Sequence, residues 1–165
     1  MAKKEVKTNA MRNLERGGVA YVAHIHEETV DPMDDRFYGL HLAQILGQDP
    51  DCVFKTLVAR GAGGGFFVFV IPVAQTLDLK RAAKAVGEKS VSLLPVKDLL
   101  GVTGYVRGGC SPIGMKKQFP TVFHSTVENL DTVFVSGGRI GTQVEVKARQ
   151  LLAMLGAKTA EIITE

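Results

Sequence analysis

The chain has 165 residues, of which 45% are apolar and 22% charged, and its formal net charge is +3 at pH 7. These values are typical of a soluble globular protein with one substantial core. No apolar run approaches the roughly 18 residues that cross a bilayer, and the first residues lack the apolar stretch of a signal peptide. The absence of such a run excludes a membrane-spanning helix, and we expect a cytoplasmic protein without membrane contact.

The first predicted element is a helix with clear boundary signals. Thr8 is suited to cap a helix that runs through Arg16 and ends at Gly17 and Gly18, because glycine is favoured just beyond a helix C-terminus. The elements that follow are a strand over 19–26, an acidic loop over 27–35 and a helix over 37–46 that is stopped by Gly47.

The middle of the chain predicts a hairpin. A β-prone run over 51–58 contains Lys55, the segment 60–65 is a turn, and 66–71 is a continuous apolar strand. Because that strand has no polar alternation, we expect it to be buried on both faces. The later predicted elements are helices over 77–86, 96–100 and 148–155, and strands over 91–94, 121–124, 132–136 and 143–146.

These elements predict one domain over 1–165 of the α/β (α+β) class. The chain contains no internal repeat, low-complexity segment or linker that would mark a boundary. Strands outnumber helices and several are joined by short turns, which favours a mixed sheet over a doubly wound one.

Two glycine-rich segments are the strongest candidates for a binding site. They are 105–114, which reads YVRGGCSPIG, and 135–141, which reads VSGGRIG. Glycine has no Cβ, so backbone amides in such loops can approach a carbonyl, carboxyl or phosphate oxygen closely. We therefore expect the two loops to form walls of one pocket. The alternative is a pair of structural turns.

A lysine within a β-prone run adds a third feature. Lys55 alternates with Val53 and Leu57, so it shares a strand face with apolar neighbours. A strand lysine usually points to solvent. Together with the glycine loops, however, its position favours an ammonium group that faces the pocket rather than solvent.

The histidines and cysteines give weaker signals. His24 and His26 share one face of a strand, but no carboxylate or cysteine lies at a matching close spacing, so we expect no metal site. His41 and His124 are expected at the surface or the core edge. Two cysteines in a domain of this size argue against a disulfide framework. Cys110 lies inside the first glycine loop, where we favour a packing role over attack by its thiol.

The motifs occur in the order seen in a known family. The matching segments are 53–57, 103–114 and 135–138, with further agreement at 71–74, 77–80, 116–117 and 119–121. On these motifs the chain resembles the YbaK/ProX family of aminoacyl-tRNA editing domains, from about His24 to the C-terminus. The resemblance implies a twisted, barrel-like mixed β-sheet surrounded by helices.

The resemblance also implies an activity. It is deacylation of a mischarged tRNA, most plausibly Cys-tRNA(Pro), by attack of the substrate's own cysteine thiol on the ester. Related domains instead act on Ala-tRNA(Pro), and a non-catalytic nucleotide- or tRNA-binding module is a further alternative. No cofactor is implied. The expected partners are the 3′ acceptor end of tRNA and prolyl-tRNA synthetase, which would select the tRNA.

The resemblance assigns roles to individual residues. Lys55 would contact the terminal ribose or phosphate and stabilise negative charge, although a role as general base is a rival. His26 falls where the family often carries a tyrosine beside the pocket, and Gln143 where some members have aspartate. The other expected substrate-binding residues are Thr56, Gly108, Gly109, Ser111, Pro112, Gly114, Ser136, Gly137 and Gly138. Arg107, Lys116, Lys117 and Arg139 flank the glycine loops as candidate contacts to phosphate.

Overall fold

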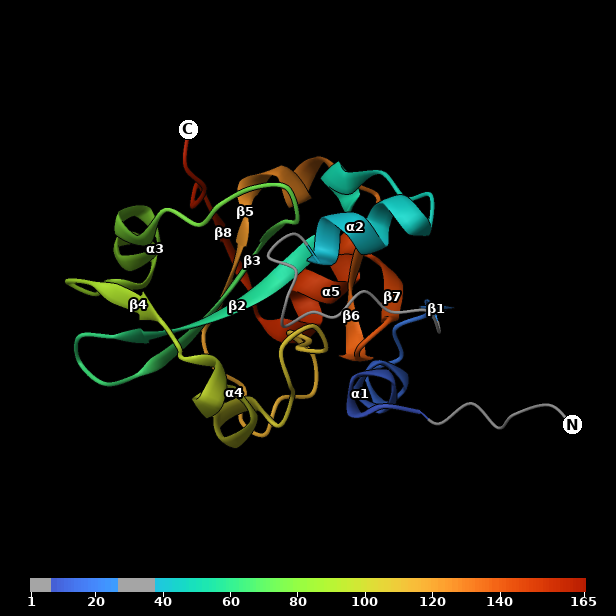
Figure 1. Ribbon diagram of the computed structural model, residues 1–165, viewed down its shortest axis with the longest axis horizontal. Coiled ribbons are helices and arrows are strands. Elements are labelled where there is room, and N and C mark those ends of the chain that lie inside the picture. Colours follow the sequence, from blue (N-terminus) through green and yellow to red (C-terminus); the bar gives the residue numbers. More distant parts are fainter. Residues whose placement is uncertain (1–6, 27–37) are drawn as a thin grey trace, which may run out of the picture.

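The computed structural model describes residues 7–26 and 38–165 (Figure 1). The α-helices are α1 (Asn9–Arg16), α2 (Tyr38–Ile45), α3 (Leu79–Val86), α4 (Val96–Thr103) and α5 (Ala148–Leu155). The strands are β1 (Tyr21–Ile25), β2 (Phe54–Gly61), β3 (Phe66–Pro72), β4 (Val91–Leu93), β5 (Thr121–His124), β6 (Thr132–Arg139), β7 (Thr142–Lys147) and β8 (Lys158–Ala160). Two 3₁₀ helices, η1 (Pro50–Cys52) and η2 (Ser125–Asn129), complete the described elements.

The strands form two sheets. One contains three antiparallel strands in the order β1-β7-β6, and the other contains five in the order β4-β2-β3-β5-β8. In the larger sheet β2 pairs antiparallel with β3 and β4, whereas β5 pairs parallel with β3 and β8. The larger sheet is therefore mixed, as the sequence predicts.

The two sheets enclose one core and are joined by a β-bridge. A parallel bridge between Val53 and Phe134 joins the start of β2 to β6. Buried residues of both sheets, such as Val58 and Val68 from one and Val135 and Val144 from the other, belong to the same cluster. This arrangement gives the barrel-like shape that the family resemblance implies, with helices around it (Figure 1).

The apolar strand β3 is buried on both faces, as predicted. Val68 and Val70 face the main core, whereas Phe69 and Ile71 face a second cluster. The second cluster includes Ala82 and Ala83 of α3, so α3 covers the outer face of the larger sheet. Burial on both faces explains why this strand carries no polar alternation.

Local signals define most helix boundaries. The Thr8 hydroxyl accepts a hydrogen bond from the Met11 amide and donates one to the Gly137 carbonyl, so it caps α1 and ties it to the end of β6. α5 ends at Gly156, whose left-handed conformation (φ +60°) closes the helix C-terminus. Both boundaries agree with the sequence prediction.

Other boundaries differ from the prediction for physical reasons. α3 begins at Leu79 rather than 77, because Asp78 caps it by accepting from the amides of Lys80 and Arg81. Leu77 instead forms an antiparallel bridge with Ile163. α4 extends to Thr103 and ends at left-handed Gly104. The predicted acidic loop over 27–35 lies outside the described residues, as does the predicted first residue of α2.

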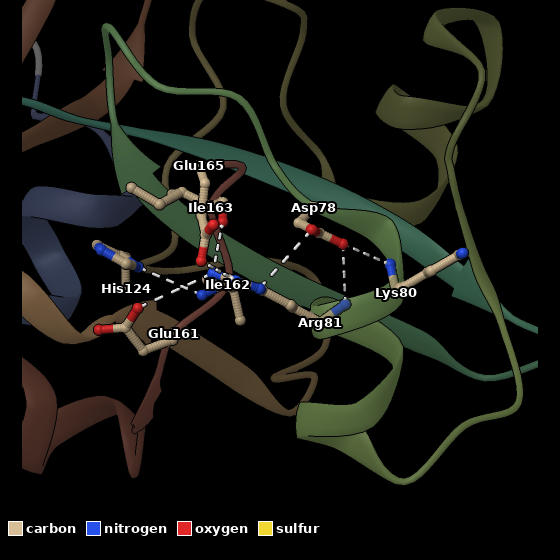
Figure 2. Close-up of polar contacts among 8 residues, drawn as sticks. All are labelled: Asp78, Lys80, Arg81, His124, Glu161, Ile162, Ile163 and Glu165. Atoms are coloured by element: carbon tan, nitrogen blue, oxygen red, sulfur yellow. Dashed lines mark hydrogen bonds and ion pairs between the residues drawn. The ribbon is translucent and has the colours of Figure 1, made fainter.

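The C-terminal segment is fastened beside α3 by a polar cluster (Figure 2). The Arg81 guanidinium lies 2.8 Å from a Glu165 carboxylate oxygen and donates to the Ile163 carbonyl at 3.1 Å. His124, which is 2% exposed, accepts from the Ile162 amide through Nδ1 at 3.3 Å.

Across the described ranges, none of the helices has the length and apolar character that a membrane crossing requires.

Candidate functional site

A pocket of about 220 Å³ opens where the two sheets meet. Its walls come from the start of β2, the first glycine loop, the paired strands β6 and β7, and α2, which lies over this end of the sheets (Figure 1). The lining residues are Gly39, Leu42, Val53, Phe54, Lys55, Thr56, Leu57, Val73, Arg107, Gly108, Cys110, Ser136, Thr142 and Gln143. Predicted residues from four separate segments, Lys55, Thr56, Gly108, Ser136 and Gln143, are thus brought together.

Lys55 is a half-buried cation in the wall of this pocket. In the β2–β3 ladder it lies opposite Ile71, two pairs along from Leu57 and Phe69, so its strand face is apolar as predicted. Burial lowers the pKa of its ammonium group, because desolvation disfavours the charged form. Lys55 forms no ion pair or hydrogen bond with the residues the structure describes. Its charge is therefore available to an anionic group in the pocket.

Two buried polar atoms of residues in the pocket wall have no hydrogen-bond partner among the described residues. They are Oγ1 of Thr56 on β2 and Oε1 of Gln143 on β7. Gln143 is only 5% exposed. Leaving such an atom unpaired costs on the order of 1–3 kcal/mol. A polar ligand that bonds to them would recover this energy, so the pocket is built for a ligand with hydrogen-bonding groups.

A β-bulge shapes the opposite wall. Ser136 pairs with Gln143, and the register of β6 against β7 then shifts between Ser136 and Arg139. The Ser136 hydroxyl accepts from the Gly138 amide at 3.2 Å, so it holds the bulge and still lines the pocket. Bulges commonly re-aim side chains beside functional sites.

The other predicted glycines frame the pocket rather than line it. A Cβ on Gly109 would lie 3.0–3.2 Å from backbone atoms of Arg139 and Ile140, so the two glycine loops pack directly against each other. Gly138 packs against Tyr105 and Thr8, and Gly137 against Thr142. Gly114 packs against Tyr105 and α1 and lines a second cleft.

Three further predicted residues also lie outside the lining. The Ser111 hydroxyl is fully buried and accepts from the Ile113 amide at 3.2 Å, which stabilises the turn through buried Pro112. His26 follows β1, where its backbone amide donates to the Gly141 carbonyl. These residues hold the loops in shape.

Cys110 lines the pocket but its thiol is poorly suited to attack. It is 8% exposed, and burial raises its pKa to about 12. The reactive form of cysteine is the thiolate, which is scarce near neutral pH at such a pKa. This environment agrees with the packing role expected from the sequence.

Part of the pocket lining is not evident from the sequence. The sequence marks Arg107 only as a cation flanking the first glycine loop, yet it lies in the pocket wall. Gly39 and Leu42 come from α2, and the Gly39 backbone approaches so closely that a Cβ would lie 3.0 Å from a Val73 methyl. No local pattern in 38–45 marks this contact, because it depends on how α2 is placed over the sheets.

One of the two histidines in the predicted strand over 19–26 contacts a carboxylate. His24 Nε2 lies 2.9 Å from Glu145 Oε1 on the adjacent strand, a carboxylate that the sequence spacing did not reveal. Within residues 7–26 and 38–165, no three His, Cys, Asp or Glu side chains gather closely enough to hold a metal ion.

Fold and pocket together define a mixed α+β domain with a small site. The site combines glycine-loop residues with a lysine and buried polar atoms that have no partner within the described ranges. Residues 40–154 match the family model of the aminoacyl-tRNA editing domain. The chain belongs to this family.

Full-length relatives agree with the assignment. A protein of Enterococcus faecalis named "Putative Cys-tRNA(Pro)/Cys-tRNA(Cys) deacylase EbsC" is 44% identical over 167 residues, which cover 100% of this chain and 99% of the relative. Two crystal structures share the fold at lower identity. One, of hypothetical protein APE2540, has a TM-score of 0.84 at 22% identity and covers 95% of this chain and 100% of its own. The other, described as "a putative trans-editing enzyme for prolyl tRNA synthetase", has a TM-score of 0.80 at 23% identity, covering 98% and 100%.

Proposed function

We propose that this protein is a trans-editing deacylase that cleaves the aminoacyl ester of mischarged tRNA, with Cys-tRNA(Pro) as its substrate. The observation that carries the proposal is the pocket at the junction of the sheets. It is lined by half-buried Lys55 and by Thr56 and Gln143, whose buried side-chain oxygens have no partner in the part of the chain that the structure describes. Family membership supports the reaction, and the 44% identical deacylase supports the cysteinyl substrate.

The size of the pocket suits a small aminoacyl group. Its volume of about 220 Å³ is below the roughly 300–1,000 Å³ that is typical for drug-sized ligands. The walls combine apolar groups, such as Val53 and Leu42, with a few polar ones. A small side chain can therefore be enclosed while its ester carbonyl meets hydrogen-bond donors.

The donors are arranged for a developing negative charge. Lys55, Arg107 and Gly108 all line the pocket, and the donors they can supply are an ammonium, a guanidinium and a backbone amide. Fixed donors in a partly desolvated site stabilise an oxyanion far more than water does. In this proposal Lys55 contacts the terminal ribose or its phosphate, and Thr56, Ser136 and Gln143 hold the amino group and carbonyl.

The pocket's own side chains favour a nucleophile that comes from the substrate. Among the described lining residues there is no histidine, aspartate or glutamate to act as a base, and burial keeps Cys110 protonated. The thiol of the bound cysteine can attack its own ester carbonyl, forming an S–C bond as the C–O bond to the ribose breaks. The thiol proton passes to the departing ribose oxygen, and water then opens the cyclic thioester. Proximity supplies much of the acceleration.

Selection of the tRNA is proposed to come from a partner. Prolyl-tRNA synthetase, which releases the mischarged tRNA, is the expected one, and the reaction then takes place in the cytoplasm where tRNA is charged. Co-purification in the presence of tRNA and synthetase tests this association. Repeated failure to recover the protein with either one would remove it from the proposal.

The test is release of labelled amino acid from tRNA(Pro) charged separately with cysteine, alanine or proline. Wild type should release cysteine, and Lys55→Met should not. Lys158→Met is the matched control, because Lys158 is an exposed strand lysine on β8 away from the pocket, and it should behave as wild type. Lys55→Arg keeps the charge but cannot act as a base, so retained activity excludes the general-base role.

Each outcome has a distinct meaning. Release of alanine but not cysteine would keep the deacylase and overturn the thiol-assisted step. No release from any of the three, even with synthetase added, would overturn the proposed function and favour a binding module. Full activity of Lys55→Met would overturn the assignment of Lys55.

A further inference from the structure

A second cleft lies on the other side of the first glycine loop. Its volume is about 370 Å³. It is lined by one face of α1, by the end of α4 and by the returning part of the loop, with residues Asn9, Asn13, Arg16, Thr103, Gly104, Tyr105, Gly114, Met115 and Lys116. Figure 1 shows α1 and α4 on the same side of the molecule, with the loop after α4 running between them.

The charge of this cleft has one sign. Arg16 and Lys116 are its charged residues, and no carboxylate is among the described residues that line it. Neither cation forms an ion pair with a carboxylate in residues 7–26 or 38–165. The acidic residue of α1, Glu15, is occupied by Lys7 at 2.6 Å. The cleft therefore presents positive charge that no carboxylate of the described residues neutralises.

Its hydrogen-bonding groups are mainly donors. The Tyr105 hydroxyl is already used, since it donates to the Ile113 carbonyl at 2.6 Å, and Lys116 reaches the Gly101 carbonyl only at 3.5 Å. The Arg16 guanidinium forms no hydrogen bond with the described residues. Asn13 uses one amide hydrogen on the Asn9 carbonyl and keeps another. Guanidinium, ammonium and amide groups around one space match the oxygens of a phosphate group.

One loop connects this cleft to the aminoacyl pocket. Gly104, Tyr105 and Gly114 line the cleft, whereas Gly108 and Cys110, between them in sequence, line the pocket. An RNA strand whose 3′ end enters the pocket can thus place a neighbouring phosphodiester in the cleft. We propose that the cleft between α1 and the first glycine loop binds the phosphodiester backbone of the RNA that carries the aminoacyl ester. This inference rests on the proposed function and adds a binding site to it.

The test uses the double variant Arg16→Gln/Lys116→Gln in the full chain. Both side chains are exposed, so the fold should be retained, which thermal unfolding checks. The matched control is Lys80→Gln/Lys84→Gln, which removes the same charge from exposed positions on α3, far from α1 (Figure 1). The probe is a single-stranded RNA with the 3′ sequence of tRNA, titrated against each protein over a range of salt concentrations.

The expected result is weaker RNA binding by the cleft variant alone. The slope of log affinity against log salt should fall in magnitude by about 0.7, because each phosphate neutralised on a single strand contributes about 0.7 and the cleft holds one. On charged tRNA the variant should raise KM and leave kcat unchanged. Equal weakening by the α3 control, or unchanged binding by the cleft variant, would overturn the proposal.

A second set of measurements distinguishes binding of RNA from binding of free phosphate. It also distinguishes failure of this inference from failure of the proposed function. If inorganic phosphate at matched ionic strength shifts Arg16 and Lys116 in NMR spectra while the double variant binds RNA normally, the cleft is an anion site and the RNA proposal falls. Deacylation by wild type with no effect of the double variant would leave the function standing without the inference. Loss of RNA binding by the variant, in a protein that deacylates none of the charged tRNAs, would support the cleft and remove the function.

Discussion

Replacement of Gly114 by alanine tests how tightly the first glycine loop packs on α1. Gly114 has φ +75°, and an added Cβ would lie 2.9 Å from the Tyr105 hydroxyl, 3.0 Å from Asn13 Nδ2 and 3.0 Å from the Asn9 carbonyl carbon. The left-handed conformation costs a non-glycine residue about 1–2 kcal/mol. Overpacking against these atoms costs about 1–3 kcal/mol more. We therefore expect the free energy of unfolding to fall by roughly 2–5 kcal/mol.

The control separates the two contributions. Gly18 has φ +70° but nothing lies within 4 Å of its added Cβ, so Gly18→Ala should cost only the conformational part. Urea unfolding of both variants gives the difference, provided the dependence on denaturant is unchanged. If Gly114→Ala were no less stable than Gly18→Ala, the close contact between the loop and α1 would be refuted.

Three other predictions concern ionisable groups. Lys55→Met should abolish deacylation but raise the free energy of unfolding at neutral pH. Burial lowers the Lys55 pKa, so at pH values well below the unfolded pKa of 10.5 the protonated amine destabilises the folded state. A less stable Lys55→Met variant would contradict this. Cys110→Ala should retain turnover of Cys-tRNA(Pro), since the pKa of about 12 leaves almost no thiolate; complete loss would make Cys110 the nucleophile. Burial lowers the pKa of His124, so the unfolded state binds more protons and stability should fall as pH drops below 6.5 toward the folded pKa. Urea midpoints between about pH 8 and pH 5 measure this slope, and His124→Asn should reduce it.

Boundaries set by local chemistry could be predicted from the sequence. Thr8 at the start of α1 and Gly156 after α5 each satisfy backbone groups within one turn, so the residues that cause the boundary are also adjacent in sequence. The cap formed by Asp78 at the start of α3 is equally local, but the helix predicted from the sequence also includes Leu77, the apolar residue before it. Leu77 is apolar because it faces the second core cluster and bridges Ile163, which the local pattern does not show.

Elements defined by distant partners could not be predicted. β8 has only three residues, and its strand conformation comes from parallel pairing with β5. In the site, Lys55 and Gly108 were found because they belong to motifs. Arg107 lines the pocket although the sequence does not assign it there, and Gly114 lines the second cleft although the sequence assigns it to the pocket. Both differences arise because the path of the loop decides which of its faces meets the pocket and which meets α1.

The bond from Thr8 to the Gly137 carbonyl couples α1 to both glycine loops. α1 has eight residues, too few for an isolated helix to be stable in water, so it persists only while it is packed on its neighbours. Tyr105 and Gly138 are packed against each other beside the same cap. Helix and loops should therefore open together as one cooperative unit. Amide protons of 9–16, 105–114 and 137–141 should then exchange with a common free energy of opening, and a ligand that holds α1 would protect them all.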